Sequence, residues 1–120
     1  MNPTCKYELH LDDEAEMMLM GHAVFLAKDN PSASVKLIDI FDECLDKIEA
    51  NPLVYQFADE RDVPGIPPKT YRRCIFKRYY KIVYRVDGQM IKVTAVIDAR
   101  AENKGLFGNA TDQADEPAGA

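Results

Sequence analysis

The sequence predicts a small two-layer α+β domain, in which an antiparallel helix hairpin packs on a small, mainly antiparallel sheet. Three observations support this fold class. A short alternating pattern opens the chain, two helical patterns follow with a break at Asp29-Asn30-Pro31, and alternation returns from about residue 71. A chain of 120 residues suits a single domain with one hydrophobic core. The predicted element order is β-α-α-β-β-β.

Residues 6–28 are predicted to form a strand and then a helix. Apolar and polar residues alternate over residues 6–11, which is typical of a strand with one buried face. The group Asp12-Asp13-Glu14 indicates the start of a helix over residues 13–28, because negative side chains suit the positive end of the helix dipole. Within that helix the run Met17-Met18-Leu19-Met20 is apolar on more than one side. We interpret most of it as core packing and leave open that part of it meets a second helix or a partner.

A second helix is predicted over residues 31–50. Asn30 is a favoured N-cap, Pro31 suits the first helical position, and Asn51-Pro52 marks the end. The short connection between the two helices predicts an antiparallel hairpin. Residues 52–70 are rich in proline and are predicted to be irregular. The apolar residues expected to hold the first part of this segment to the core are Leu53, Val54, Tyr55 and Phe57.

Three further strands are predicted over residues 71–77, 79–86 and 90–98. Asp87-Gly88 is a strong turn signal, so these strands are expected to form an antiparallel meander. We expect the helices to cover one face of the sheet and to leave the other for solvent or a partner. The residues expected to face inward are Tyr80, Ile82, Tyr84 and Val86, followed by Ile91, Val93, Ala95 and Ile97.

Composition narrows the class of protein. No apolar run approaches the roughly 20 residues that a membrane helix needs, and the N-terminus has no basic region followed by an apolar one. The three cysteines, Cys5, Cys44 and Cys74, lack the spacing of a metal site or a disulfide framework. We therefore expect a cytoplasmic protein with reduced thiols, no metal, no cofactor and no membrane association.

Charge is distributed unevenly along the chain. Residues 69–104 carry 10 Lys and Arg against 3 Asp and Glu, a net charge of +7, whereas the whole chain has a net charge of −5. A basic stretch of this kind can attract nucleic acid or an acidic protein surface. Residues 108–120 are poor in apolar side chains, and we expect a flexible acidic tail after a domain over residues 1–107.

The basic stretch carries a recognisable series of motifs. Thr70-Tyr71-Arg72-Arg73 leads to Tyr80-Lys81-Ile82-Val83-Tyr84-Arg85-Val86, and Ile91-Lys92-Val93-Thr94-Ala95-Val96-Ile97 ends in Asp98-Ala99-Arg100. Together with the preceding helices, this pattern resembles the RelE/ParE superfamily of toxins from type II toxin–antitoxin (plasmid stabilisation) systems. The resemblance covers residues 7–100. It implies a cognate antitoxin partner and a toxin–antitoxin hetero-oligomer.

The superfamily has two branches, and the resemblance implies a different target for each. RelE-like toxins cut messenger RNA on the ribosome, whereas ParE-like toxins poison DNA gyrase. Arg72, Lys81 and Arg100 match positions that contact phosphate in the RNA-cutting branch, where cations stabilise developing charge. However, Cys74 replaces a second basic residue, and Leu106 or Phe107 stands where a proton-transferring tyrosine is expected. His10 and His22 are predicted to lie away from these motifs, so no general base is evident.

The ParE-like function is therefore our leading hypothesis, with gyrase or another protein as the target. An RNA endonuclease that uses Arg72, Lys81 and Arg100 is the alternative, and a degenerate, non-toxic binding module is the third. An ion pair between Asp98 and Arg100 is the plain structural interpretation of those two residues. We expect the antitoxin to contact the basic strands and the helix face at residues 17–20. The residues expected to bind a protein partner are Tyr71, Arg73, Lys77, Arg78, Tyr79 and Arg85.

Overall fold

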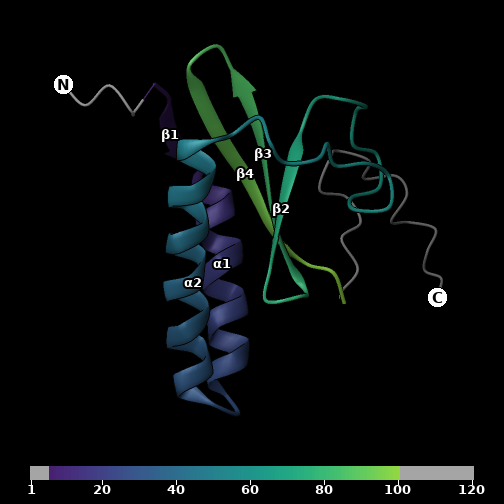
Figure 1. The fold of residues 1–120 in the computed structure, drawn as a ribbon. Coiled ribbons are helices and arrows are strands. Elements are labelled where there is room, and N and C mark those ends of the chain that lie inside the picture. The colour runs from purple at the N-terminus through teal and green to yellow at the C-terminus, as the bar shows by residue number, and fades with distance from the viewer. Residues whose placement is uncertain (1–5, 101–120) are drawn as a thin grey trace.

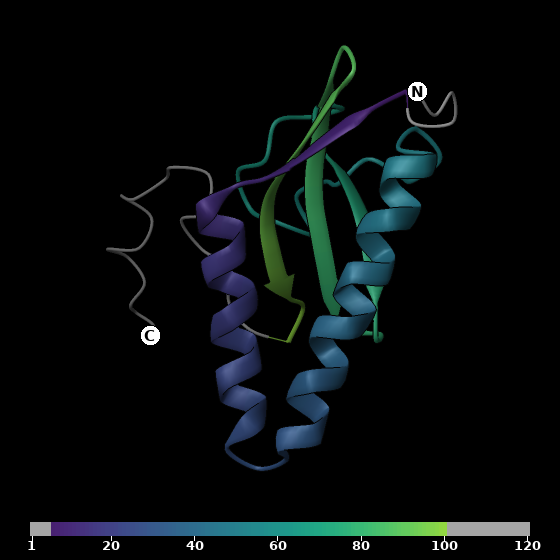
Figure 2. The same ribbon diagram turned by 90° about the vertical axis from the view of Figure 1, so that its left-hand side faces the viewer.

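The computed structural model describes residues 6–100 of the chain and confirms the predicted α+β fold. Two helices lie side by side along one face of a four-stranded sheet (Figure 1, Figure 2). The expected tail over residues 108–120 lies outside the described residues. The elements in chain order are β1 (Glu8–Leu11), α1 (Asp13–Ala27), α2 (Pro31–Ala50), β2 (Arg72–Phe76), β3 (Tyr80–Asp87) and β4 (Met90–Asp98).

The helix hairpin is built from local signals in the sequence. α1 begins at Asp13, with three acidic residues in its first turn. The Asn30 side chain accepts a hydrogen bond of 3.3 Å from the backbone N–H of Ala33, and this caps the N-terminus of α2. Pro31 occupies the first turn, where no backbone N–H is needed. These caps fix the tight connection that turns the chain back on itself.

The sheet has the strand order β1-β4-β3-β2. β2, β3 and β4 pair in an antiparallel manner, as predicted, and β1 joins the edge of β4 in a parallel register that places Leu9 opposite Ile91. Parallel pairing requires a crossover connection, and here the chain from α1 to β3 lies between the two paired strands. The first and last strands of the domain therefore become neighbours.

The main core lies between the helix hairpin and the sheet. Leu37, Phe41 and Ile48 of α2 pack there with Ile82 and Tyr84 of β3, and all five are almost fully buried. The Tyr84 hydroxyl donates a hydrogen bond of 2.6 Å to the carbonyl of Pro52, which ties the end of the hairpin to the sheet. A buried hydroxyl needs such a partner.

β4 does not keep one alternating pattern along its length. Val83 pairs with Ala95 and Tyr84 with Val93, so Thr94 is an extra residue and forms a β-bulge. The expectation that Ala95 and Ile97 share a face with Ile91 and Val93 is therefore wrong. Beyond the bulge the parity is inverted, and Ala95 and Ile97 face away from the helices. The Thr94 hydroxyl donates a hydrogen bond of 3.2 Å to Val83 at this point.

The second face of the sheet is covered, contrary to expectation. Ala58, Val63 and Ile66, from the irregular segment between α2 and β2, are buried there. They pack against Val83, Ala95 and Ile97 of the sheet. Of the residues expected to hold this segment to the core, only Tyr55 packs against it, whereas Leu53 and Val54 are 54% and 70% exposed and Phe57 is 39% exposed. The middle of this segment, rather than its beginning, packs against the sheet.

The apolar run at residues 17–20 also differs from the prediction of core packing. Leu19 is buried and Met18 is half-buried, but Met17 and Met20 are exposed to 72% and 47%. The helix therefore presents apolar side chains on its solvent side as well as on its core side. Neither described helix is long and apolar enough to span a membrane.

Candidate functional site

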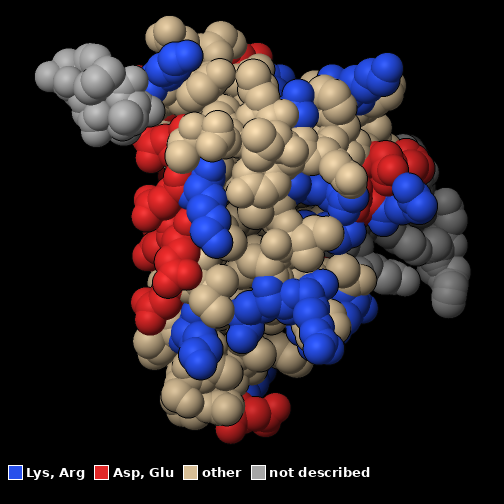
Figure 3. All heavy atoms as spheres, viewed as in Figure 1, with Lys and Arg blue, Asp and Glu red and all other residues tan. Residues whose placement is uncertain are grey.

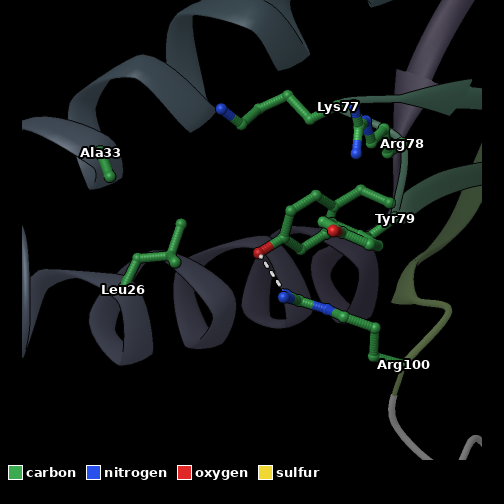
Figure 4. Close-up of a pocket in the computed structure, with 7 residues that line it drawn as sticks. Leu26, Ala33, Lys77, Arg78, Tyr79 and Arg100 are labelled. Atoms are coloured by element: carbon green, nitrogen blue, oxygen red, sulfur yellow. Dashed lines mark hydrogen bonds between the residues drawn. The ribbon is translucent and has the colours of Figure 1, made fainter.

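A basic turn and the helix hairpin line an open surface hollow of about 400 Å³. Lys77, Arg78 and Tyr79 reach it from the β2–β3 turn, and Arg100 follows β4 (Figure 4). Leu26 and Ala33 form its apolar side from the two helices, and Tyr80 completes the lining. The hollow therefore combines three cations with apolar and aromatic surface.

The turn that carries two of these cations has an unusual backbone. Lys77 and Arg78 both adopt the left-handed conformation, with φ of 48° and 69°. That region favours glycine, asparagine and aspartate, and each other residue placed there stores about 1–2 kcal/mol of strain. Two long basic side chains are thus held at a position where local backbone preferences select against them. Strain of this kind is concentrated at functional sites.

Arg100 is anchored on the wall of the hollow. Its guanidinium contacts both carboxylate oxygens of Asp98, at 2.8 and 3.0 Å, and its planar group lies 4.2 Å from the centroid of the Tyr79 ring. The Tyr80 hydroxyl lies 3.4 Å from the same guanidinium. The hydrogen bonds from Arg100 lower the pKa of Asp98 below its usual value. The ion pair anticipated between these two residues is present.

His22 was expected to lie away from the motifs, and this expectation is wrong. Its Nε2 lies 2.8 Å from the carbonyl of Val96, to which the ring N–H donates, and its ring centroid is 5.4 Å from that of Tyr80. Beyond Val93 the edge of β4 has no strand beside it in the described chain, so His22 satisfies an edge carbonyl. His10, by contrast, lies beside Asp12 at 3.6 Å.

Arg72, Lys81 and Arg100, the three predicted phosphate contacts, are not brought together. Arg72 donates to the carbonyl of Tyr55 at 2.7 Å and stacks 4.0 Å from the Phe57 ring centroid. Arg72 pairs across the sheet with Tyr84, whereas Arg100 contacts Tyr80. These two tyrosines are four residues apart on β3, which corresponds to a separation of about 13 Å. Lys81 points to the opposite face of the sheet, where it binds Asp62 at 2.5 Å.

The remaining predicted binding residues are also dispersed. Arg73 joins Lys81 at Asp62, with 3.4 Å between its Nε and the carboxylate, and Arg85 pairs with Asp87 at 2.9 Å. Tyr71 packs against the cluster on the second face, and its backbone carbonyl accepts a hydrogen bond from Ala58. Of the predicted set, Lys77, Arg78, Tyr79 and Arg100 gather at the hollow, whereas Arg73 and Lys81 meet at Asp62 on the second face.

Charge separates across the molecular surface. In the view of Figure 3, Lys and Arg side chains gather over the β2–β3 side, whereas Asp and Glu line the edge formed by α2. Lys77 and Arg78 are exposed, and neither forms an ion pair with any residue from 6 to 100. Within the same range no group of three or more His, Cys, Asp or Glu side chains could hold a metal ion. The site is therefore suited to an anionic group carried by a partner.

Leu26, Ala33, Tyr80 and His22 belong to this region but were missed by the sequence reasoning. Leu26 and Ala33 lie close to the tight connection between the helices. Their contribution depends on where the hairpin tip meets the β2–β3 turn, which is a tertiary contact. Tyr80 was assigned to the core, and its ring is buried there as expected, but its hydroxyl reaches Arg100.

Comparisons with known proteins identify the family. Residues 9–102 match the family described as the ParE toxin of the type II toxin–antitoxin system, parDE. A search of curated proteins finds no match. Among solved structures, the fold is similar to one titled "Chromosomal ParDE TA system from P. aeruginosa", with a TM-score of 0.63 and 15% identity over 78% of this chain and 96% of the other. The chain belongs to the ParE toxin family of type II toxin–antitoxin systems.

Proposed function

We propose that this chain is a growth-inhibiting toxin that acts by binding a cellular protein such as DNA gyrase, and that a cognate antitoxin neutralises it in the cytoplasm. The observation that carries the proposal is the hollow beside the β2–β3 turn, where Lys77 and Arg78 are exposed and have no acidic partner among the described residues. Family membership supports the toxin class. Gyrase as the target and neutralisation by an antitoxin are what the resemblance to the toxin family implies, and the hollow is the surface proposed to bind both partners.

The chemistry of the hollow suits recognition rather than bond cleavage. Its ionisable lining consists of lysine, arginine and tyrosine, and burial raises the pKa of Tyr80 above its usual value. A tyrosine with a raised pKa is a poor general base near neutral pH. Cations beside Leu26 and Ala33 instead suit a protein segment in which an acidic side chain adjoins an apolar one.

The same surface is proposed to bind the antitoxin. A segment with acidic residues would be attracted to the basic turn and would compete with the target for it. Neutralisation then requires no change in the shape of the toxin, because occupancy of the turn is sufficient. The toxin–antitoxin complex is accordingly proposed to be a hetero-oligomer.

RNA cleavage is the weaker alternative. The reaction needs cations around one phosphate and a group that moves protons. Arg72, Lys81 and Arg100 are engaged by the carbonyl of Tyr55, by Asp62 and by Asp98. Arg72 and Arg100 also lie at different ends of β3, and Lys81 lies on the other face. A degenerate binding module, the third possibility, would keep the fold but not inhibit growth.

The experiment combines Lys77→Glu with Arg78→Glu and follows growth, gyrase supercoiling and messenger RNA integrity. The matched control reverses the same number of charges at Arg61 and Lys47, which are exposed and lie outside the hollow. We expect the native chain to arrest growth and inhibit supercoiling without cutting RNA, and the Lys77/Arg78 variant to lose at least tenfold in inhibition. The Arg61/Lys47 variant should retain it, and co-expressed antitoxin should restore growth.

Other outcomes would replace the proposal. RNA cleavage that disappears with Arg100→Ala would establish the nuclease. Normal growth with abundant folded protein would indicate the degenerate module. Equal loss of inhibition in both charge-reversal variants would mean that overall charge, not the β2–β3 turn, determines binding.

A further inference from the structure

The chain leaves the end of β4 beside the basic turn. The backbone N–H of Ala99 donates a hydrogen bond of 2.6 Å to the carbonyl of Tyr79. The next residue, Arg100, lines the hollow and stacks 4.2 Å from the Tyr79 ring centroid (Figure 4). Lys77 and Arg78 immediately precede Tyr79 and are exposed. The residues that follow Arg100 therefore begin at the hollow itself.

The segment that follows is acidic. Asp112, Asp115 and Glu116 lie within five positions, and no Lys or Arg follows Lys104. Residues 105–120 thus carry a net charge of −3. The hollow presents three cations, and the two on the β2–β3 turn have no acidic partner in the described chain. Such a segment is attracted to such a turn, because their charges are opposite and neither of the two cations is already paired.

The other basic residues on the strands are less available to an acidic segment. Arg73 and Lys81 both lie within ion-pair distance of the buried carboxylate of Asp62. Arg85 pairs with Asp87 at 2.9 Å. An acid that approached these cations would have to compete with an acid of the same sheet face, whereas at the β2–β3 turn no such competitor is present in the described chain.

Apolar side chains strengthen the match between the segment and the hollow. Leu106 and Phe107 lie between Arg100 and the acidic group. Leu26 and Ala33 form the apolar side of the hollow. The segment therefore offers apolar groups and charges together, as the hollow does, and the charges have the opposite sign.

The length of chain is sufficient for the acids to reach the turn. Asp112 is 12 residues beyond Arg100. A coil of that length has a root-mean-square end-to-end distance of about 20 Å and can extend to about 40 Å. Because the tether starts at the hollow, its effective concentration there is in the millimolar range. A contact that is weak by itself would thus occupy the hollow for a substantial part of the time.

We propose that residues 105–116 fold back on the domain and bind the hollow, with Asp112, Asp115 and Glu116 beside Lys77 and Arg78, so that the chain partly masks its own partner-binding surface. The acidic group lies beyond residue 102, where the family match ends, so the fold does not depend on it. The docking itself is independent of the proposed function, but its regulatory effect rests on that function. Partners bind only the fraction of molecules whose hollow is free, which weakens their apparent affinity by that fraction.

The first test is NMR of the full chain, because it detects docking without an activity assay. The triple variant Asp112→Asn/Asp115→Asn/Glu116→Gln removes the charges but keeps the length and shape of the segment. We expect the backbone amide signals of Lys77 and Arg78 to differ between the native chain and this variant. Adding NaCl to about 0.5 M should move the native signals toward those of the variant, because salt screens exposed charges.

The matched control is Asp39→Asn/Asp42→Asn/Glu43→Gln on α2. These three exposed acids have the same spacing as the acids of the segment, and their neutralisation makes the same change in net charge. The control should leave the Lys77 and Arg78 signals unchanged. Native-like signals in the first variant, or equal shifts in both, would overturn the proposal. A native docking shift that grows with protein concentration would also overturn it, because the segment would then occupy the hollow of a second copy.

The second test measures the regulatory effect as inhibition of gyrase supercoiling. The Asp112/Asp115/Glu116 variant should inhibit at a severalfold lower concentration than the native chain, and the α2 control should match the native chain. Weaker inhibition by the first variant would overturn masking, because the segment would then assist target binding. If the NMR signals shift but inhibition is unchanged, docking is established and the target binds elsewhere, which contradicts the proposed function and not the docking. If no chain inhibits gyrase, the NMR result still decides the docking.

Discussion

Arg100 connects three features at the level of single residues. Its guanidinium binds Asp98, stacks on Tyr79 and contacts the hydroxyl of Tyr80, so that one side chain links the end of β4 to the start of β3. The interaction with Asp98 neutralises part of its charge, whereas Lys77 and Arg78 have no acidic partner among the described residues. Arg100 is therefore better placed to shape the hollow than to supply its free charge.

This arrangement predicts how Asp98 responds to Arg100→Gln. The substitution removes the hydrogen bonds that lower the Asp98 pKa, so that pKa should rise. A lowered pKa stabilises the fold above the unfolded-state value and loses that contribution as the pH falls through the folded-state value. We expect the variant to be less stable than the native chain at pH 7, and the difference to shrink toward pH 2, where Asp98 is protonated in the unfolded chain. NMR titration of the Asp98 carboxyl and urea unfolding at both pH values test this.

The control for that titration is Arg61→Gln, which removes an exposed partner of Asp59 and lies outside the interactions of Asp98 with Arg100. It should leave the Asp98 titration unchanged. An Asp98 pKa that is the same in Arg100→Gln and in the native chain would mean that the ion pair does not persist in solution.

On the second face of the sheet, Asp62 pairs with basic strand residues as Asp98 pairs with Arg100. It is 7% exposed, and its carboxylate lies within ion-pair distance of both Lys81 and Arg73. These two cations compensate a buried charge that would otherwise be costly. Lys81 was expected to contact phosphate and Arg73 to bind a partner, but both are paired with an acid of the same chain.

The cysteines are similarly enclosed. Cys44 and Cys74 are both buried, and burial raises the pKa of each thiol, to about 11 for Cys74. Thiols with raised pKa values are poor nucleophiles at neutral pH. Cys74, which replaces a basic residue of the RNA-cutting branch, is therefore part of the core beside α2 rather than part of a reactive surface.

At the level of elements, the β2–β3 turn has a backbone conformation that its two basic residues do not favour. Residues with φ near +50° to +70° are favourable as asparagine or glycine, yet the turn has Lys77 and Arg78. The double variant Lys77→Asn/Arg78→Gly should raise the free energy of unfolding by about 1–2 kcal/mol because it relieves this strain. The same change removes two cations and should reduce growth inhibition. Urea unfolding and the growth assay measure the two effects separately.

The control is a substitution that adds backbone strain at another turn instead of relieving it. Gly88, in the β3–β4 turn, has φ of 60° and open space around it, so Gly88→Ala adds only backbone strain. We expect it to lower the free energy of unfolding by about 1 kcal/mol without affecting inhibition. If Lys77→Asn/Arg78→Gly is no more stable than the native chain, the strain at the β2–β3 turn is not real.

At the level of the whole molecule, the sheet is enclosed on both faces. The helix hairpin covers one face, and Ala58, Val63 and Ile66 cover part of the other. Val63→Ala should therefore lower the free energy of unfolding by about 2 kcal/mol, because it leaves a cavity at a fully buried position. Val54→Ala, the same change at a position that is 70% exposed, should cost less than 0.5 kcal/mol. Equal losses in urea unfolding would show that residues 57–66 do not form a packed layer.

Much of the architecture follows from patterns that act over a few residues. The Asn30-Pro31 start of α2 and the Asp87-Gly88 turn were predictable, because capping and turn formation depend on the local backbone. The Thr94 bulge was not, since a strand pattern that changes parity reads as continuous alternation until its partner is known. Lys77, Arg78, Tyr79 and Arg100 were identified as candidate residues but not as a group.

The sequence by itself determined the order of elements, the helix hairpin, the basic final third and the resemblance to a toxin family, because these depend on local propensity, periodicity and composition. Only the tertiary structure decided which cations remain available. Arg73 and Lys81 are paired with Asp62, whereas Lys77 and Arg78 have no acidic partner in the described chain. The physical reason is that an ion pair depends on distance in space, and Asp62 reaches β2 and β3 only when the intervening segment folds across the sheet.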